Sequence, residues 1–425
     1  MLRAIETVFV SLTLALTALG FVGAYLMHFP PPLSVELPVE PYESAFGVPW
    51  RYLVALYVFL VLLGTAAIAS AGEVLHIKEI EVIVKDAVVI AILSIIVGLI
   101  TIAFDLERIE RAGYATLGHA NPTSVMYWMI MFYILELIFL IVESWFYFRS
   151  DLVKQSELKG VKGAVGKILS LRFIGDYIQN RYFTSSALNK LAKYLTTRDK
   201  SIDSEVARSI GIVALITAVL AYSNLGALFA ASYIPLWHDA ITPIYFVVTA
   251  IFGGAAILVI ATIVTSWATS SKEKLSALPV LRKILGVSLA IALLFTAWRA
   301  VIVGYPGVNH FAAISVANLM FGSYALNFWI VEVLLGMVIP IFLLLLRGNS
   351  IKVLLTSSVL VIAGVFTYRF DFIFAGQVVK NISGLSLPTP PHPFELMFIL
   401  GALALVTFAY YAVYKLLPME VEHAS

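Results

Sequence analysis

Residues 87–104 read AVVIAILSIIVGLITIAF, a run of eighteen residues without a charged side chain. As an α-helix rising about 1.5 Å per residue, such a run crosses most of a hydrocarbon layer of about 30 Å. Comparable runs recur along the 425 residues, of which 61% are apolar and 13% charged. Soluble domains average about 45–50% and about 25%. The sequence therefore predicts an all-α polytopic membrane protein and excludes a soluble globule of this size.

We expect about ten transmembrane helices in a single integral membrane domain. The first run follows Met-Leu-Arg, as a signal peptide would, but it exceeds twenty residues and lacks a small-x-small cleavage site before His28, so we expect it to be retained. The expected spans are residues 5–28, 49–72, 82–104, 123–148, 207–231, 243–267, 283–304, 322–346, 351–374 and 393–416.

The distribution of lysine and arginine predicts how these spans are oriented. Alternate connections divide the 28 basic residues 22 to 6, and 10 to 6 when the long 149–208 connection is left out. Connections rich in lysine and arginine stay in the cytoplasm. We therefore expect a multi-pass protein of the cell membrane with both termini cytoplasmic.

The 149–206 connection is long enough to have a structure of its own. Between Gly166 and Leu195 it combines apolar residues such as Phe173 and Tyr177 with basic ones such as Arg172 and Lys190. This pattern predicts a cytoplasmic basic amphipathic segment at the headgroup level, with anionic membrane lipid as its partner. The alternative is a solvated lysine-rich loop. No nucleic-acid partner is expected.

The chain contains no cysteine, so it can hold no iron–sulfur cluster, disulfide or thiolate metal site of its own. Its histidines also argue against haem, because five of the seven fall in the expected outer connections and none lies deep in a span. A b-type haem needs two buried axial ligands. We therefore expect neither a haem nor a metal site in this chain.

Ionisable residues inside the membrane are costly unless they are paired or hydrated. We place Glu332 near the midplane and Glu136 somewhat toward the cytoplasm, with Asp86 and Glu143 near the inner surface. An outer tier includes Arg299, Arg369 and Glu395. One interpretation is a hydrated proton route through these seven residues. The other is that Glu332 and Glu136 only fasten neighbouring helices through hydrogen bonds.

Several strings resemble a known family of membrane subunits. Residues 103–112 read AFDLERIERA and residues 121–128 read NPTSVMYW. They resemble the Asp-Leu-x-Arg and Asn-Pro-x-Ser-x-Met-x-Trp elements of the NrfD-like, polysulfide-reductase-type family. Residues 222–226 (YSNLG), 235–237 (PLW) and 391–395 (PHPFE) are similar to later elements of that family, in the same order. Ile109 and Asn224 depart from its strings.

This resemblance implies a fold of two four-helix bundles plus extra spans. It also implies a quinone, of the menaquinone type or similar, bound near the outer face where a ferredoxin-like iron–sulfur subunit docks. A molybdopterin or nickel–iron subunit would perform the terminal chemistry. No catalytic residue is assigned, and the chain would be a non-catalytic or a quinone-reactive subunit of a respiratory oxidoreductase.

A quinone needs an apolar slot, hydrogen-bonding groups at its carbonyl oxygens and a proton partner. By the family pattern, Tyr222 is the expected carbonyl partner, supported by Asp105 and Arg108. The other candidates at the outer ends of spans two to five are Trp50, Arg51, Tyr52, Tyr127 and Trp128. Two other functions stay open at this point, a secondary transporter and a purely structural membrane anchor.

Overall fold

The computed structural model describes residues 2–29, 52–105, 113, 121–181, 185–232, 234–269, 272–304, 310–380, 384–385 and 392–420. Within these ranges the chain is almost entirely helical, and ten helices or helix pairs are long and apolar enough to span a membrane. The prediction of an all-α protein with ten spans is confirmed. The chain is a multi-pass integral membrane protein.

The observed elements follow the expected spans closely. Between the spans lie α4 (Lys78–Glu81), the 3₁₀ turn η2 (Glu273–Ala277), the two-residue strands β1 (Val379–Lys380) and β2 (Gly384–Leu385), and helices described below. The spans are α1 (Leu2–His28), α2 (Tyr52–Val61) with α3 (Thr65–Val74), α5 (Val84–Asp105), α6 (Val125–Gln155), α10 (Ser201–Ala230), α11 (Thr242–Thr269), α12 (Leu278–Gly304), η3 (Asn327–Val338) with α14 (Ile339–Arg347), α15 (Ile351–Val378) and α16 (Pro393–Leu416).

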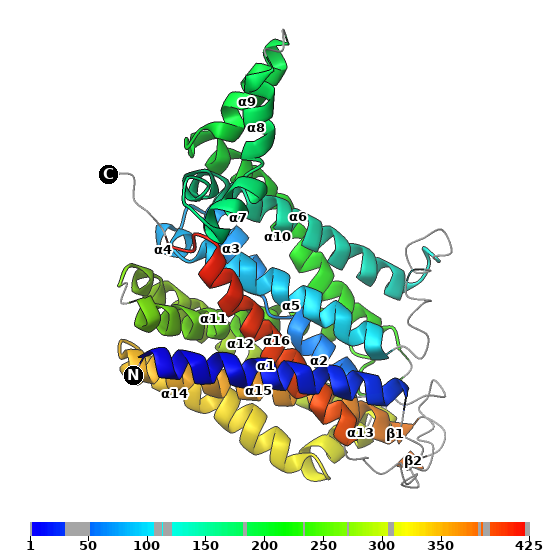
Figure 1. Ribbon diagram of the computed structural model, residues 1–425. Coiled ribbons are helices and arrows are strands. Elements are labelled where there is room, and N and C mark those ends of the chain that lie inside the picture. Colours follow the sequence, from blue (N-terminus) through cyan, green and yellow to red (C-terminus); the bar gives the residue numbers. More distant parts are fainter. Residues whose placement is uncertain are drawn as a thin grey trace.

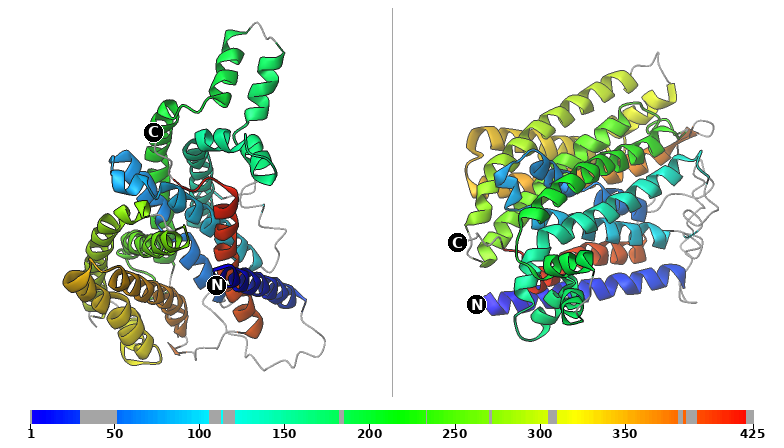
Figure 2. Two further views of the ribbon diagram at one scale, coloured as in Figure 1. Left: turned by 60° about the vertical axis from the view of Figure 1, so that its left-hand side comes forward. Right: turned by 90° about the horizontal axis from the view of Figure 1, so that it is seen from above.

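Spans two to five pack into one four-helix group (α2/α3, α5, α6 and α10), and spans six to nine pack into a second (α11, α12, η3/α14 and α15). The two groups meet where α10 and α3 contact α11 and where α15 contacts α2. Helices α1 and α16 form an additional antiparallel pair beside α5 (Figure 1). Figures 1 and 2 show that α1 begins and α16 ends at the same side of the bundle, here named the termini side.

The second span is interrupted between Val61 and Thr65. At the break, the backbone N–H of Gly64 donates to the carbonyl of Ala250 in α11, at 3.0 Å. A Cβ on Gly64 would lie 2.5 Å from that carbonyl oxygen, and one on Gly254 would lie 2.5 Å from the carbonyl carbon of Gly64. Irregular backbone at membrane depth needs a protein partner for its polar groups. Here two glycines let α11 provide it.

Two further features lie in the second group. The short helix α13 (His310–Phe321) precedes the eighth span, on the side opposite the termini. The eighth span then begins as the π-helix η3, which packs against α15 where Gly336 meets Gly364. A Cβ on Gly364 would lie 2.5 Å from the Cα of Gly336. Extended π-helix is rare and often marks a functional position, and Glu332 lies within this one.

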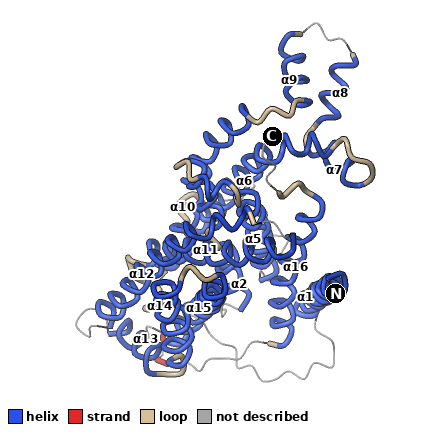
Figure 3. The backbone as a smooth tube through the Cα atoms, turned by 90° about the vertical axis from the view of Figure 1, so that its left-hand side faces the viewer, coloured by secondary structure: helices blue, strands red, loops and turns tan. Residues whose placement is uncertain are grey.

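The long connection folds into three short helices, α7 (Val161–Leu169), α8 (Arg172–Asn180) and α9 (Ser186–Thr196). Helices α8 and α9 pack together as a hairpin. The hairpin projects sideways from the bundle, across the direction in which the transmembrane helices run (Figures 1 and 3).

Candidate functional site

A layer of polar side chains is buried inside the apolar bundle, in the half farther from the termini side. Its members lie between about 5 and about 17 Å from the ends of their helices, at about 1.5 Å per residue. We name this set the buried polar layer. It consists of Tyr57 in α2, Tyr133 and Glu136 in α6, Tyr222 in α10, Tyr245 and Thr249 in α11, Arg299 in α12, Glu332 in η3, and Tyr368, Arg369 and Asp371 in α15.

The first bundle contributes a tyrosine–carboxyl pair. The hydroxyl of Tyr222 donates to Oε1 of Glu136 at 3.0 Å, and these side chains are 1% and 0% exposed. Tyr133 lies one turn from Glu136 on α6, and its ring is 6.4 Å from that of Tyr57. Within the described part of the chain, Oε2 of Glu136 and the hydroxyl of Tyr133 have no hydrogen-bond partner.

This pair forms because α6 and α10 pack along most of their length. The face of α10 that is buried carries small residues, including Gly211, Ala214, Ala218 and Ala221, which allow a close helix approach. The carboxyl of Glu136 therefore meets the hydroxyl of Tyr222 directly across the helix interface.

Arg369 lies where the two bundles meet. Its Nη2 donates to the hydroxyl of Thr249, and its guanidinium lies over the rings of Phe246, at 4.5 Å, and Tyr368, at 5.0 Å. It also lies within electrostatic range of Tyr133 and Glu332. Among the residues that the structure describes, Nε and Nη1 have no hydrogen-bond partner, and no carboxylate lies within 4.0 Å of the guanidinium. Within the described part of the chain, Arg369 is therefore a fully buried arginine without a close ion pair.

The second bundle contains a partly open cavity of about 40 Å³, enough for a few water molecules by the rule that one needs about 10–15 Å³. Glu332 and Asp371 both line it, and Asn327 donates to Oδ1 of Asp371 at 3.1 Å. No described residue hydrogen-bonds to the carboxyl of Glu332 or to Oδ2 of Asp371. The other polar residues of its wall are Tyr245, Thr296, Arg299 and Tyr368.

Arg299 lines this cavity and is held by the loop before α11. Its Nε lies 3.3 Å from Oδ2 of Asp239, and its Nη2 donates to the carbonyl of Leu236 at 2.6 Å. Tyr245 shares a hydrogen bond of 2.8 Å with Thr296. The wall is therefore held by the loop before α11 and by α12.

Buried polar atoms in proteins nearly always have a partner, either protein or ordered water. The layer gathers several that lack a partner among the described residues, on Tyr133, Glu136, Arg369 and Asp371. This pattern is typical of an interior that holds water or a polar ligand. Chemically, such a layer can bind a carbonyl oxygen and can accept, hold and release protons.

The structure brings together only some residues of the predicted quinone set. Tyr222 belongs to the buried layer, whereas Tyr127 and Trp128 lie near the start of α6, eight or nine residues, or about 12 Å, from Glu136. The indole N–H of Trp128 donates to the carbonyl of Pro122, and Tyr52 stacks on Phe374 of α15 at 3.9 Å. Asp105 ends α5. Trp50, Arg51 and Arg108 lie outside the described residues.

The predicted proton-route residues separate in a similar way. Glu136, Glu332, Arg299 and Arg369 share the layer, but three others have different surroundings. Asp86 is paired with Lys274 at 2.6 Å and accepts from Tyr410, while Glu143 accepts from Ser70 and Tyr147. Glu395 caps the first turn of α16, because its carboxylate accepts from the backbone N–H of His392.

Sequence reasoning missed Tyr57, Tyr133, Tyr245, Tyr368 and Thr249 as members of this site. The spacing of Tyr133 and Glu136, three residues apart on one helix face, was a signal for one of them. The others are tyrosines and a threonine in apolar spans, where nothing in the local pattern distinguishes them from packing residues.

Comparison with known proteins places the chain in a family. Residues 42–381 match the family described as "Polysulphide reductase, NrfD". The chain is 24% identical to a selenate reductase subunit of Mesobacillus selenatarsenatis over 344 residues, 79% of this chain and 76% of that protein. It is 23% identical to the Hdr-like menaquinol oxidoreductase integral membrane subunit of Archaeoglobus fulgidus over 428 residues, 96% of this chain and 92% of that protein. The match to the family extends over most of the chain and includes eight of its ten spans, so the protein belongs to the NrfD polysulphide reductase family.

Proposed function

We propose that this protein is the quinone-reactive membrane subunit of a respiratory oxidoreductase complex. It would exchange electrons between the quinone pool and an iron–sulfur subunit docked on the side opposite the termini. The chain aligns with 92% of a relative that is named as a menaquinol oxidoreductase subunit. This similarity supports the class and favours a menaquinone-type quinone. The partner that performs the terminal chemistry would be a molybdopterin or nickel–iron subunit.

The observation that carries the proposal is the buried hydrogen bond between Tyr222 and Glu136. A phenol can donate to a quinone carbonyl oxygen, and a carboxyl beside it can take or give the proton that accompanies quinone reduction. The pair lies within about 17 Å of the helix ends where an external electron carrier would dock. When a quinone is bound, it supplies the redox chemistry, and this chain orients its head group.

Around this pair, Tyr133 and Tyr57 would form the near wall of the head-group site. Tyr52, Tyr127 and Trp128, with Trp50, Arg51, Asp105 and Arg108 from the adjoining chain segments, would form its entrance. The aromatic rings of Tyr52, Tyr127 and Trp128 suit the apolar ring and tail of a quinone. Tyr222 and Glu136 would then be the positioning and proton-exchanging groups at the inner end of the slot.

The test is Tyr222→Phe in the purified complex, with turnover measured against a soluble quinol analogue and against an artificial dye that bypasses the membrane. Loss of one hydrogen bond in the transition state is expected to lower quinol turnover by about tenfold or more, while dye activity stays unchanged. Tyr411→Phe is the matched control, because Tyr411 donates to Glu6 at 2.6 Å on the termini side, away from the layer. Equal quinol kinetics in the two variants would remove Tyr222 from the site.

We also propose that Glu332 and Glu136 exchange protons with the quinone site, which would make quinone turnover electrogenic. The cavity beside Glu332 and the unsatisfied polar atoms around Arg369 support this, because hydrated carboxyls inside a membrane can relay protons. Arg299 and Arg369 would stabilise the charged intermediates. Asp86 and Glu143 would form the entry from the cytoplasm, and Glu395 would lie near the exit.

Glu332→Gln tests this route because it keeps the shape of the side chain and abolishes its titration. In proteoliposomes the variant complex is expected to assemble and to lose quinol-driven membrane potential. Glu6→Gln, at the termini side of α1, is expected to retain it. Potential generation at the unmodified level in an assembled Glu332→Gln complex would leave Glu332 with a packing role only.

A further inference from the structure

The α7–α9 segment, residues 161–200, is the most basic part of the molecule. It carries eight lysines and arginines against two acidic residues, Asp176 and Asp199. We name it the basic arm. Neither quinone chemistry nor proton transfer uses it, and it lies at the termini side, far from the buried polar layer (Figure 1).

The arm is amphipathic, and its apolar side chains are not used up in its own packing. Helices α8 and α9 meet through small residues, since a Cβ on Gly175 would lie 3.1 Å from the carbonyl of Ala192. This leaves large apolar groups exposed on all three helices. Their exposed fractions are 70% for Val161, 60% for Ile168, 52% for Tyr177, 46% for Phe173 and 45% for Leu191.

The position of the arm brings these groups to a membrane surface. Its hairpin projects sideways, across the direction of the spans, in views related by a quarter turn (Figures 1 and 3). It is carried by α6 and α10, which have 31 and 30 residues. About 20 residues suffice for the hydrocarbon layer, so the ends of α6 and α10 reach the headgroup region. A hairpin that leaves them sideways runs over the lipid beside the bundle.

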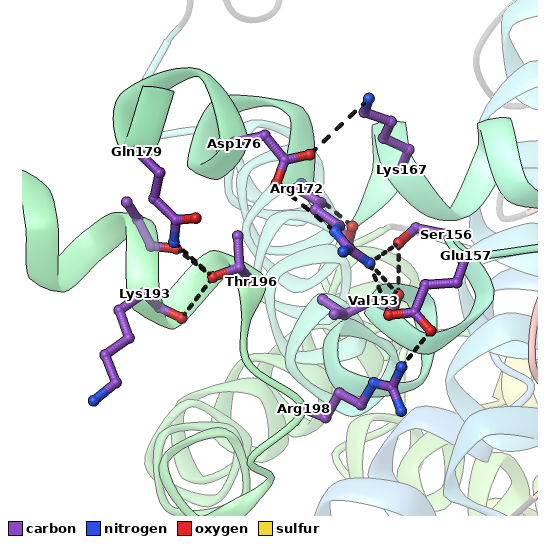
Figure 4. A network of polar contacts seen from close by, with 12 residues as sticks. Val153, Ser156, Glu157, Lys167, Arg172, Asp176, Gln179, Lys193, Thr196 and Arg198 are labelled. Carbon is purple, nitrogen blue, oxygen red and sulfur yellow. Dashed lines mark hydrogen bonds and ion pairs between the residues drawn. The ribbon is translucent and has the colours of Figure 1, made fainter. Parts of the chain in front are cut away.

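The arm is fastened at its base, so its direction is fixed by the fold. Arg172 donates to Ser156 at 2.8 Å and lies 3.3 Å from Glu157, which also pairs with Arg198 (Figure 4). The contacts with Arg198 and Arg172 hold the pKa of Glu157 below its usual range, so this carboxylate stays charged at neutral pH. At the base as well, where the C-terminal part of the arm leads into α10, Arg149 of α6 is paired with Asp203 of α10 and donates to the carbonyl of Tyr194.

We propose that the basic arm binds anionic phospholipid in the leaflet on the termini side, with the exposed Lys162, Lys190 and Lys193 on phosphate groups and its exposed apolar residues at the headgroup–acyl boundary. The net charge favours an anionic partner, and the sideways projection places the arm over lipid instead of beneath the bundle. Basic amphipathic helices with exposed aromatic and aliphatic groups bind such surfaces.

The absence of native cysteine makes the test direct. The full chain carries a single nitroxide label at Phe173→Cys, at Leu191→Cys, or at Gln179→Cys, which is about 120° from Phe173 around α8. Each protein is placed in nanodiscs of zwitterionic phosphatidylcholine or of the same lipid with phosphatidylglycerol. Collisions of the label with dissolved oxygen and with an aqueous nickel chelate then report its depth. In anionic discs we expect the labels at 173 and 191 to collide mainly with oxygen and the label at 179 mainly with nickel.

Neutralising lysines adds a quantitative measurement to the test. Lys190→Gln with Lys193→Gln is expected to lower the ratio of inserted to free arm about 30-fold, from about 1 kcal/mol per basic residue. Lys272→Gln with Lys352→Gln, two exposed lysines outside the arm, is the matched control and is expected to change nothing. A salt titration of the otherwise unmodified labelled chain, from about 0.05 to about 1 M, gives the same information without substitutions and should release the arm.

Three results would overturn the proposal. The first is that labels at 173 and 191 collide mainly with nickel in anionic discs. The second is insertion that is equal in both lipids and insensitive to salt, which would mean apolar insertion without headgroup recognition. The third is protection that appears only after a soluble partner protein is added, which would make the arm a protein-docking surface.

Discussion

Replacing Arg149 by alanine should release the base of the arm from the bundle. Arg149 is fully buried at the end of α6. Its Nε donates to both oxygens of Asp203, at 2.8 and 2.9 Å, and its Nη2 lies 2.7 Å from Oδ2. It also donates to the carbonyls of Tyr194, Thr197 and Asp199. One guanidinium thus joins α6, α10 and the end of α9.

The expected cost follows from what the substitution leaves behind. Among the described residues, Asp203 would keep one side-chain partner, the hydroxyl of Tyr194 at 2.6 Å, and three carbonyls would lose a charged donor. Removing one partner of a buried ion pair costs about 3–5 kcal/mol, because the remaining charge is uncompensated. Since about 1.4 kcal/mol corresponds to a factor of ten, local opening of α9 should increase by about two to three and a half orders of magnitude.

Thiol labelling can measure this opening. Leu195 is 4% exposed in α9, and Leu195→Cys gives the chain its single cysteine. The labelling rate is measured where it rises in proportion to reagent concentration, so that it reports the opening equilibrium. Adding Arg149→Ala should raise the rate by the factor above. Asp203→Asn in the same background should recover part of the protection by removing the uncompensated charge.

Arg198→Ala is the matched control, since it also removes one arginine–carboxylate pair of the arm. Both side chains of this pair are about half exposed, Arg198 at 54% and Glu157 at 47%. Exposed pairs contribute about 0.2–1 kcal/mol, so the rate should rise less than about sixfold. If Arg149→Ala labels no faster than Arg198→Ala, then the Arg149 cluster does not hold the arm and the argument from burial fails.

Two further predictions concern the packing of the spans and their orientation. A Cβ on Gly401 would lie 2.3 Å from the Cα of Gly20, whereas one on Gly286 would meet nothing within 4 Å. Gly401→Ala should therefore lower the thermal midpoint by separating α1 from α16, and Gly286→Ala should leave it unchanged or raise it slightly; the same midpoint in both variants would contradict this. From the division of lysine and arginine, an impermeant thiol reagent applied to intact cells should modify Thr389→Cys and not Lys162→Cys, and the reverse pattern would invert the topology.

The spans could be predicted because their signal is local. Each needs only a sufficient run of apolar residues, and ten such runs are visible in the sequence. The interruption at Gly64 could not, because it depends on a hydrogen bond to Ala250, nearly two hundred residues away. Glycine inside an apolar run is compatible with a continuous transmembrane helix. Helix α13 was missed for a different reason, because its 12 residues are too few to be recognised as a transmembrane helix.

The site could be predicted only in part. The depth of a residue in the membrane follows from its position along its own helix, whereas its neighbours depend on how different helices pack together. Counting residues identified Glu136, Glu332 and Arg369 as ionisable groups inside the membrane. The same counting predicted a series of ionisable groups from one membrane surface to the other, with Asp86 near the inner surface and Glu395 near the outer one. The structure places Asp86 in an ion pair with Lys274 and uses Glu395 as a helix cap. Which tyrosines face Arg369 depends on how α2, α6, α11 and α15 are packed.

The lateral arrangement changes how charge can be held in this protein. Arg369 is a buried positive charge within electrostatic range of Glu332, and among the described residues it has no carboxylate within 4.0 Å. Arg299 is already paired with Asp239. In a medium of low dielectric constant, one arginine can balance about one carboxylate at tolerable cost. Glu332 and Asp371 line the same cavity, so the proposed proton steps there would share this counter-charge, and ionisation of one of the two carboxyls would favour protonation of the other.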